Sequence, residues 1–264
     1  MKLLILDGNS VINRAYFGVK PLTNRDGLYT HAIFGFLNIL ERMQKEEQPD
    51  AVAVAFDLHG PTFRHQRYDG YKATRHPMPE ELAMQMPLIK DVLRAMNIPI
   101  YACEGWEADD VIGTVGRRCG AAGWDCVIVT GDRDSLQLVA PHVSVKLVIT
   151  KGGQTGSTLY TPDVFEAEYG FAPIHMIDLK SLMGDSSDNI PGVAGIGPKT
   201  ATQLLVQYGT LDGVYAHLED LKDSVRKKLE AGRENGYRSY DLATIRCEAP
   251  VAFEPEACRV QDVD

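Results

Sequence analysis

Three acidic residues follow short apolar runs of the sequence, at the points where the runs end. Asp7, Asp57 and Asp132 each come after such a run. Because the carboxyl ends of parallel strands meet at one edge of an open sheet, where ligands bind, we expect these carboxylates to converge. A single Asp after a strand commonly only begins a turn. Three in register favour a shared site.

Further acids form close groups elsewhere in the sequence. One group of three precedes an apolar helical run, and another pair has the i, i+3 spacing that places two carboxylates on one helical face. An acid in a first helical turn can simply complement the helix dipole, but crowded carboxylates raise one another's pKa unless a cation neutralises them. The expected metal ligands are Asp7, Asp57, Glu107, Asp109, Asp110, Asp132, Asp134, Asp185 and Asp188.

The donor set consists of oxygen alone, which favours Mg²⁺ or Mn²⁺ over zinc, and its size suggests two or more ions. Two such ions are the usual arrangement for in-line phosphodiester cleavage. Lys and Arg number 27 against 36 Asp and Glu, a net charge of −9. The expected ligands account for a charge of that size, so the rest of the molecule is formally neutral and an acidic partner such as DNA is not excluded.

A basic segment with interleaved tyrosines spans residues 61–76. Cations suit phosphates and aromatic rings suit unstacked bases, a combination used for single-stranded nucleic acid. An ordinary solvated face is the structural alternative. The expected nucleic-acid contacts in this segment are Arg64, Arg67, Tyr68 and Tyr71.

A glycine-rich stretch, residues 192–201, predicts a hairpin that leads into a helix with Pro198 at its first position. Free backbone N–H groups at such a helix start bind phosphate without sequence preference. A purely structural turn is the alternative. We expect Gly195, Gly197, Lys199 and Thr200 to contact nucleic acid.

The elements that position these residues alternate between strand and helix, which predicts an α/β sheet with right-handed crossovers. Helices are expected over Thr30–Glu46 and Glu80–Met96, and Gly152, Gly153 and Gly156 indicate a hairpin or loop. We expect one domain over residues 1–160 and a mainly helical one over 161–264. The expected buried parallel strands are Lys2–Leu6, Ala51–Phe56, Ile98–Tyr101, Cys126–Thr130 and Val143–Ile149.

Composition sets the class of protein. The 264 residues are 44% hydrophobic and 24% charged, which are ordinary globular values. Five cysteines with no close CxxC pair argue against a disulfide framework and a structural zinc site. The apolar opening stops at Asp7, too short for a signal peptide or membrane helix. We expect a cytoplasmic monomer with no membrane association.

Six motifs in order resemble the 5′ nuclease family, and most closely the N-terminal 5′ to 3′ exonuclease domains of bacterial DNA polymerase I. They cover nearly the whole chain: LDGNS (6–10), FDLHGPTFRH (56–65), YKATR (71–75), EADDVIGT (107–114), TGDRD (130–134) and MGDSSDNIPGVAGIGPKTA (183–201). The resemblance implies a central, mainly parallel, PIN-like sheet with a helical arch, followed by a helical subdomain with a helix-hairpin-helix motif.

The same resemblance implies an enzyme that cleaves DNA at a 5′ flap, nick or 5′ end and removes RNA primers in replication and repair. It places Lys72 and Arg75 on the scissile phosphate as catalytic residues, and it implies K⁺ at the hairpin. The chain ends where the family's nuclease domain is still incomplete, so we expect a fragment of a larger polymerase, with a free-standing nuclease as the alternative. A non-catalytic flap- or junction-binding module and a PIN-like ribonuclease are the alternative functions.

Overall fold

The structure, a computed structural model, describes residues 1–151 and 154–261. The predicted turn glycines Gly152 and Gly153 lie outside the described residues. By its internal contacts the chain divides into two compact units. Unit 1 comprises residues 1–60, 77–161 and 246–264, and unit 2 comprises residues 61–76 and 162–245. The expected division at residue 160 differs from this, because the chain passes from one unit to the other more than once.

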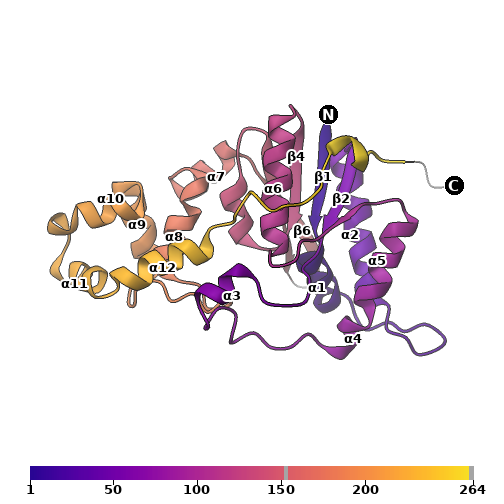
Figure 1. Cartoon of the computed structure of the whole chain (residues 1–264), viewed down its shortest axis with the longest axis horizontal. Helices are drawn as coiled ribbons and strands as arrows, with labels where there is room; N and C mark the ends of the chain where they lie inside the picture. The colour runs from indigo at the N-terminus through magenta and orange to yellow at the C-terminus, as the bar shows by residue number, and fades with distance from the viewer. Residues whose placement is uncertain (152–153, 262–264) are drawn as a thin grey trace. The chain divides into compact units, whose positions relative to one another are not determined.

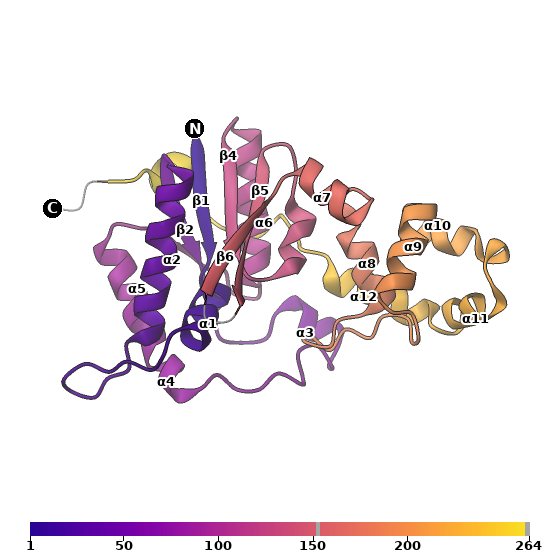
Figure 2. The ribbon, with the colours of Figure 1, turned by 180° about the vertical axis from the view of Figure 1, so that it is seen from behind.

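Unit 1 is built on a six-stranded sheet in the order β3-β2-β1-β4-β5-β6 (Figures 1 and 2). Neighbours are parallel except β5 and β6, which form an antiparallel pair at one edge. The α/β class and the five predicted parallel strands are confirmed, and Gly156 lies in the antiparallel sixth strand. The strands are β1 Lys2–Asp7, β2 Ala51–Ala55, β3 Ile100–Tyr101, β4 Asp125–Thr130, β5 Val143–Lys151 and β6 Gln154–Tyr160.

Helices cover both faces of this sheet because its strands are apolar on both sides. On one face, alternate strand residues such as Leu4, Leu6 and Val54 form a core with Phe36 and Leu93, which belong to the helices of that side. The helices of unit 1 are α1 Gly8–Gly18, α2 His31–Glu47, α4 Glu80–Ala83, α5 Gln85–Ala95 and α6 Ala108–Ala121, with 3₁₀ helices η1 Arg133–Leu138 and η4 Pro255–Cys258.

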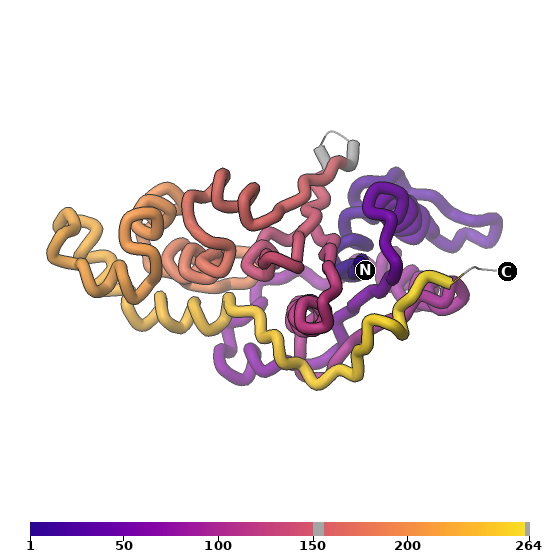
Figure 3. The backbone as a smooth tube through the Cα atoms, turned by 90° about the horizontal axis from the view of Figure 1, so that it is seen from above, coloured from indigo at the N-terminus to yellow at the C-terminus, as the bar shows by residue number. Residues whose placement is uncertain are grey.

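Helix α6 covers the other face, where Gly116 lies against Ile128 and Val143. The C-terminal run of unit 1 passes along α6, as the yellow tube shows in Figure 3. Thr114 Oγ1 accepts from the backbone N–H of Ala249 at 2.9 Å, and Arg118 donates to the carbonyl of Val251 at 2.5 Å.

The single helix expected over residues 80–96 is two helices, α4 and α5, divided at Met84.

Unit 2 is helical. Segment 61–76 carries the short helix α3 Phe63–Arg67, and its remainder is irregular. Tyr71 in this segment packs with Ile177, Ile190 and Leu242 in a small core. The other helices are α7 Pro162–Tyr169, α8 Met176–Met183, α9 Pro198–Tyr208, α10 Leu211–Ala216, α11 Asp223–Ala231 and α12 Arg233–Ala243, with 3₁₀ helices η2 Pro173–His175 and η3 Leu218–Asp220. Across the described residues, no helix is long and apolar enough to cross a membrane.

Candidate active site

The three strand-end acids lie at one edge of the sheet in unit 1. Strand β1 lies between β2 and β4, with Asp7 opposite Ala55 and Leu6 opposite Val129. Asp57 follows β2 and Asp132 follows β4, so both lie at the same end of the sheet as Asp7. The parallel register therefore brings together side chains that are 50 and 125 positions away from Asp7 in the sequence.

Asp7 is the most buried of these three carboxylates, with 6% of its surface exposed. It ends β1 and caps α1, where it accepts from the backbone N–H of Ser10 at 3.0 Å. Burial raises the pKa of Asp7 to about 7, and the charges of Asp57 and Asp132 contribute to the rise against hydrogen bonds from Ser10 and Thr130. A cation beside this carboxyl would offset the penalty that burial places on its charged form.

Thr130, the last residue of β4, connects two of the acids. Its hydroxyl donates to Asp7 Oδ2 at 2.9 Å and accepts from the backbone N–H of Asp132 at 3.0 Å. Asp132 Oδ1 in turn accepts from the backbone N–H of Asp134 at 2.9 Å. The ends of β1 and β4 are therefore held in register by side chains as well as by the sheet.

The start of helix α6 is fixed to the end of β2. The backbone N–H of Ala108 donates to Asp57 Oδ1 at 2.7 Å, which places the first turn of α6 next to that acid. Within this turn Asp109 accepts from the hydroxyl of Ser135 at 3.3 Å, and Ser135 follows Asp134 in η1. Asp109 and Asp134 therefore belong to the same edge as the three strand-end acids.

Glu107 and Asp110 have a different environment. They form a capping box at the start of α6, in which each side chain accepts from the other's backbone N–H. Asp110 is fully buried, and its second oxygen accepts from the backbone N–H of Arg246 at 2.8 Å. Backbone donors thus hold both oxygens of Asp110, and this placement supports the fold of α6 more directly than it supports metal binding.

Asp185 and Asp188 belong to unit 2 and do not lie on a helix. The structure corrects the helical-face interpretation: residues 186–189 form a turn closed by pairing between Asp185 and Ile190, because α8 ends at Met183. Asp185 accepts from Lys180 at 2.5 Å. Burial alone raises the pKa of Asp185, but hydrogen bonds from Lys180 and Ser187 outweigh it and leave the pKa below its usual value.

The chemistry of the acidic edge fits hard divalent cations, since its donors are carboxylate oxygens and hydroxyls. Within residues 1–151 and 154–261, no three His, Cys, Asp or Glu side chains converge on one point as a metal ion requires. Like charges repel, and the carboxylates of Asp7 and Asp57 accept from the local N–H groups of Ser10 and Ala108 instead. Metal ligation by the nine acids stays a prediction.

The basic segment 61–76 separates into buried and exposed side chains. Arg64 is 2% exposed and donates to the carbonyls of Leu242 and Thr244, at 2.9 and 2.7 Å. Tyr71 is 3% exposed. Both side chains are packed inside unit 2, so their burial does not support the expected contacts to nucleic acid, which stay a prediction.

The other four candidates of this segment reach the surface of unit 2 at least in part. Arg67 is exposed and pairs with Asp241 at 2.7 Å, and Tyr68 is half-buried beneath the guanidinium of Arg238. Arg75 is exposed and Lys72 is half-buried, and both lie near Asp188. These four side chains therefore remain candidates for phosphate or base contacts.

The glycine-rich stretch forms the predicted turn, and α9 begins at Pro198 as expected. Gly195 has φ +81°, a left-handed conformation that favours glycine, and its carbonyl accepts from Lys228 at 3.2 Å. Lys199 is exposed and Thr200 half-buried at the start of α9, next to Gly197. Among the described residues Lys199 forms no ion pair, so its charge is open to a ligand.

Several supporting residues of the acidic edge were not singled out from the sequence. Asn9 accepts from the backbone N–H of Asp57 at 3.0 Å, and Ser10 accepts from that of Gly131 at 2.9 Å. Arg14 donates to the carbonyl of Gly131 at 2.7 Å, where any Cβ would collide with the guanidinium. Asn9 and Ser10 lie inside the quoted LDGNS motif, so their position beside Asp7 was the available signal.

A parallel sheet with an acidic edge, followed in the chain by helices and a glycine-rich hairpin, fits a nuclease. The chain matches the family described as 5′-3′ exonuclease, N-terminal resolvase-like domain, over residues 2–170. Residues 171–264 match the same family's C-terminal SAM fold. The chain therefore belongs to the 5′-3′ exonuclease family, and the predicted family and enzyme class are confirmed.

Similar sequences are DNA polymerases I. That of Caldicellulosiruptor bescii is 46% identical over 262 residues, which are 99% of this chain and 31% of that protein. That of Bacillus subtilis is 40% identical over 251 residues, 95% of this chain and 28% of that protein. The chain thus spans less than a third of the length of these relatives.

Solved structures show the same fold at low sequence identity. T5 5′-exonuclease with bound zinc has a TM-score of 0.73 at 22% identity, covering 93% of this chain and 90% of that one. The catalytic core of Rad2 in complex with DNA substrate has a TM-score of 0.61 at 17% identity, covering 96% and 80%. At these identities the comparison establishes the architecture alone.

Proposed function

We propose that this chain is a divalent-metal-dependent, structure-specific 5′ nuclease that cleaves DNA at 5′ flaps, nicks and 5′ ends, including RNA primers on DNA. The observation that carries the proposal is the acidic edge of unit 1, where Asp7 is buried beside Asp57 and Asp132. Family membership supports the reaction class, and the carboxylate donors support Mg²⁺ or Mn²⁺.

Bound divalent ions supply an activated water and stabilise the leaving oxygen in such a reaction. The chain's own contribution is to hold the carboxylates in place. Thr130 fixes Asp7 relative to Asp132, and Ala108 fixes Asp57 relative to the first turn of α6. Asp7, Asp57, Asp109, Asp132 and Asp134, which all belong to unit 1, are the ligands we favour for two ions.

Lys72 and Arg75 are proposed to contact the scissile phosphate and to stabilise the charge that develops on it during cleavage. Their cations are half-buried and exposed respectively. Asp188 accompanies both in unit 2, so each cation has a positioning partner before substrate arrives. Arg67 and Tyr68 are proposed to contact the cleaved strand outside the reacting phosphate.

The hairpin of residues 192–201 is proposed to bind the duplex backbone. Gly195 and Gly197 offer backbone groups, and Lys199 and Thr200 lie at the positive end of α9. The carbonyl of Gly195 already accepts from an ammonium group, that of Lys228. K⁺ at other carbonyls of the hairpin is proposed from the family resemblance.

The relatives suggest the biological setting. Since the chain covers about a third or less of DNA polymerases I, we propose that the nuclease acts together with a polymerase, in replication and repair. Removal of a primer or flap by such a nuclease leaves a nick at the position where synthesis ends. We propose that the nuclease acts as a monomer in the bacterial nucleoid.

Cleavage of matched substrates tests the proposal. A 5′-flap duplex and a single-stranded RNA of equal length are incubated with the chain in Mg²⁺, in Mn²⁺ and in EDTA. We expect metal-dependent cleavage of the flap and little cleavage of the RNA. Preferred cleavage of RNA would instead indicate a ribonuclease, and tight flap binding without cleavage in either metal would indicate a binding module.

Two substitutions on one strand provide the control. Asp132→Asn, at the carboxyl end of β4, is expected to reduce cleavage by about 10² or more while flap binding persists. Asp125→Asn, at the opposite end of β4, exposed and paired with His142, is expected to leave cleavage unchanged. Equal activity in the two variants would contradict the assigned centre.

A further inference from the structure

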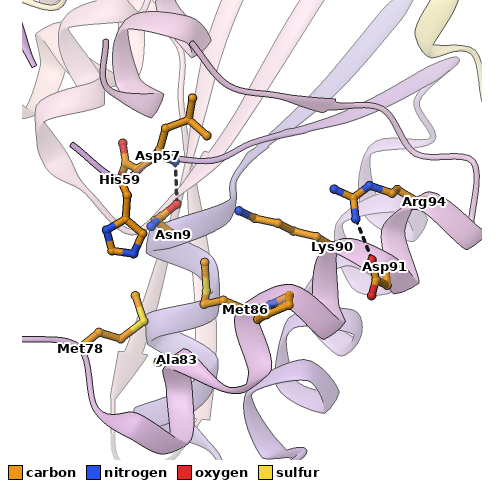
Figure 4. A pocket seen from close by; sticks show the side chains of 11 residues that line it. Asn9, Asp57, His59, Met78, Ala83, Met86, Lys90, Asp91 and Arg94 are labelled. Atoms are coloured by element: carbon orange, nitrogen blue, oxygen red, sulfur yellow. Dashed lines mark hydrogen bonds and ion pairs between the residues drawn. The ribbon is translucent and has the colours of Figure 1, made fainter. Parts of the chain in front are cut away.

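A cavity of about 530 Å³ opens beside Asp57 in unit 1, and Asp57 is the one expected metal ligand among its lining residues. It lies between the residues after β2 and the helices α4 and α5 (Figure 4). Cavities of roughly 300 to 1,000 Å³ are of the size that holds small ligands. The cavity is therefore large enough for one nucleotide.

One wall of the cavity is apolar. It is formed by Leu58, Met78, Ala83, Met86 and Pro87. Leu58 and Met78 are 46% and 41% exposed, so these side chains are not part of the sheet core. Methionine is unbranched and polarizable, and it makes favourable contacts with flat aromatic rings. This wall suits a nucleobase.

The lining also carries a cation that lacks a carboxylate partner, on the same helix as Met86. Lys90 extends from α5 toward Asn9 and Asp57, with its ammonium 4.9 Å from the centre of the Phe56 ring (Figure 4). Throughout the described parts of the chain, Lys90 forms no ion pair. Arg94, the other cation of the cavity, is already paired with Asp91 at 2.7 Å. Lys90 is therefore the group suited to a phosphate.

We propose that this cavity holds the nucleotide on the 5′ side of the cut, with its base on the methionine wall and its 5′-phosphate at Lys90. The inference rests on the proposed nuclease function, because Asp57 lies on the rim and the cut must occur close to it. When the enzyme removes a single nucleotide from a phosphorylated 5′ end, the occupant is the released 5′-mononucleotide. The cavity then contributes to product retention and to the choice of cutting position.

The methyl groups of Met78 and Met86 give a local readout that needs no cleavage. The chain is labelled with ¹³C at its methionine methyls, assigned through Met78→Leu and Met86→Leu, and titrated in EDTA with dAMP, deoxyadenosine or inorganic phosphate. We expect dAMP to shift both methyl signals saturably, deoxyadenosine to do so more weakly, and phosphate to leave them unchanged. The methyl of Met176, buried in α8 of unit 2, should not shift.

A charge substitution with a matched control tests the phosphate contact. Lys90→Gln should weaken dAMP binding by about tenfold or more, the effect of losing one charge-assisted hydrogen bond, and leave deoxyadenosine binding unchanged. Lys45→Gln, which removes an exposed lysine paired with Glu41 on α2, should change neither. Equal dAMP affinity in Lys90→Gln and wild type would overturn the assignment, as would equal methyl shifts with phosphate and dAMP.

The two proposals can fail separately. A chain that cleaves 5′ flaps but shows no methyl shift with dAMP keeps its nuclease function and loses the nucleotide subsite. A chain that binds dAMP at Met78 and Met86 but cleaves nothing keeps the cavity as a nucleotide site and loses the nuclease assignment.

Discussion

Arg75 and Asp188 form an ion pair within unit 2, with Nη2 and Oδ1 2.5 Å apart. The other oxygen of Asp188 lies 3.9 Å from Lys72 Nζ, and the backbone N–H of Lys72 donates to the Asp188 carbonyl at 2.8 Å. Lys72 has φ +54°, an unfavourable conformation for a lysine that this contact helps to hold. One carboxylate thus positions both proposed catalytic cations.

Removing this pair should slow the chemical step more than it weakens binding. Lys72→Ala and Arg75→Ala are each expected to lower the single-turnover rate on a 5′ flap by about 10² to 10³, since a contact to the developing charge is lost. Asp188→Asn should also slow it. If Asp188 acts through Arg75, the variant that carries both Arg75→Ala and Asp188→Asn is no slower than the slower of these two single variants. Effects that multiply would contradict this role and indicate that Asp188 binds metal independently.

Asp7→Asn should stabilise the fold while it abolishes cleavage. The folded-state pKa of Asp7, about 7, lies above its ordinary value of 3.8, because burial opposes the charge. At high pH, ionisation of Asp7 therefore stabilises the unfolded chain more than the folded one. The substitution by asparagine removes this difference. The resulting gain in the free energy of unfolding should be full above pH 7, shrink as the pH falls below 7 and vanish below pH 3.8.

Thermal unfolding at pH 8 and pH 5 measures this gain as a rise in Tm of a few degrees at pH 8 and less at pH 5. Mg²⁺ should raise the Tm of the wild type and have a smaller effect on Asp7→Asn, because ligands stabilise the state that binds them. Asp125→Asn serves as the control. An unchanged or lower Tm of Asp7→Asn at pH 8 would refute the buried-charge argument.

Lys199→Ala should weaken binding to every duplex sequence by a similar factor. A contact to a phosphate carries no base information, and its loss should reduce the salt dependence by about one counterion. Flap affinities in Ca²⁺ at several salt concentrations measure the slope. The paired lysine variant Lys45→Ala should leave it unchanged. A slope unaffected by Lys199→Ala would leave the hairpin as a structural turn.

Arg64→Ala should reduce the stability of unit 2. The guanidinium satisfies the buried carbonyls of Leu242 and Thr244, so its removal should lower the free energy of unfolding by about 2 to 4 kcal/mol. Arg67→Ala, which breaks the exposed pair with Asp241, should cost less than about 1 kcal/mol. Urea unfolding of the two variants distinguishes them. Similar midpoints would show that Arg64 is not structural.

The sequence by itself determined the fold class and the positions of most candidate acids. Apolar runs that end in Asp7, Asp57 and Asp132 define parallel strands and their common edge, because strand direction fixes which ends meet. The start of α9 at Pro198 also followed from a local signal, since proline is pre-organised for the first helical position. The family also followed from ordered motifs.

Only the tertiary structure separated residues of the same chemical type. Asp110 and Arg64 have the composition of site residues, yet backbone groups far along the chain, at Arg246 and Leu242, hold them in buried positions. The i, i+3 spacing of Asp185 and Asp188 fits a helix, but the chain turns there.

Lys90 gave no signal in sequence and became notable through the cavity that it lines with Met78 and Met86. Local patterns fix strands and helix ends, whereas burial and pairing depend on contacts between distant segments, which spacing alone does not specify.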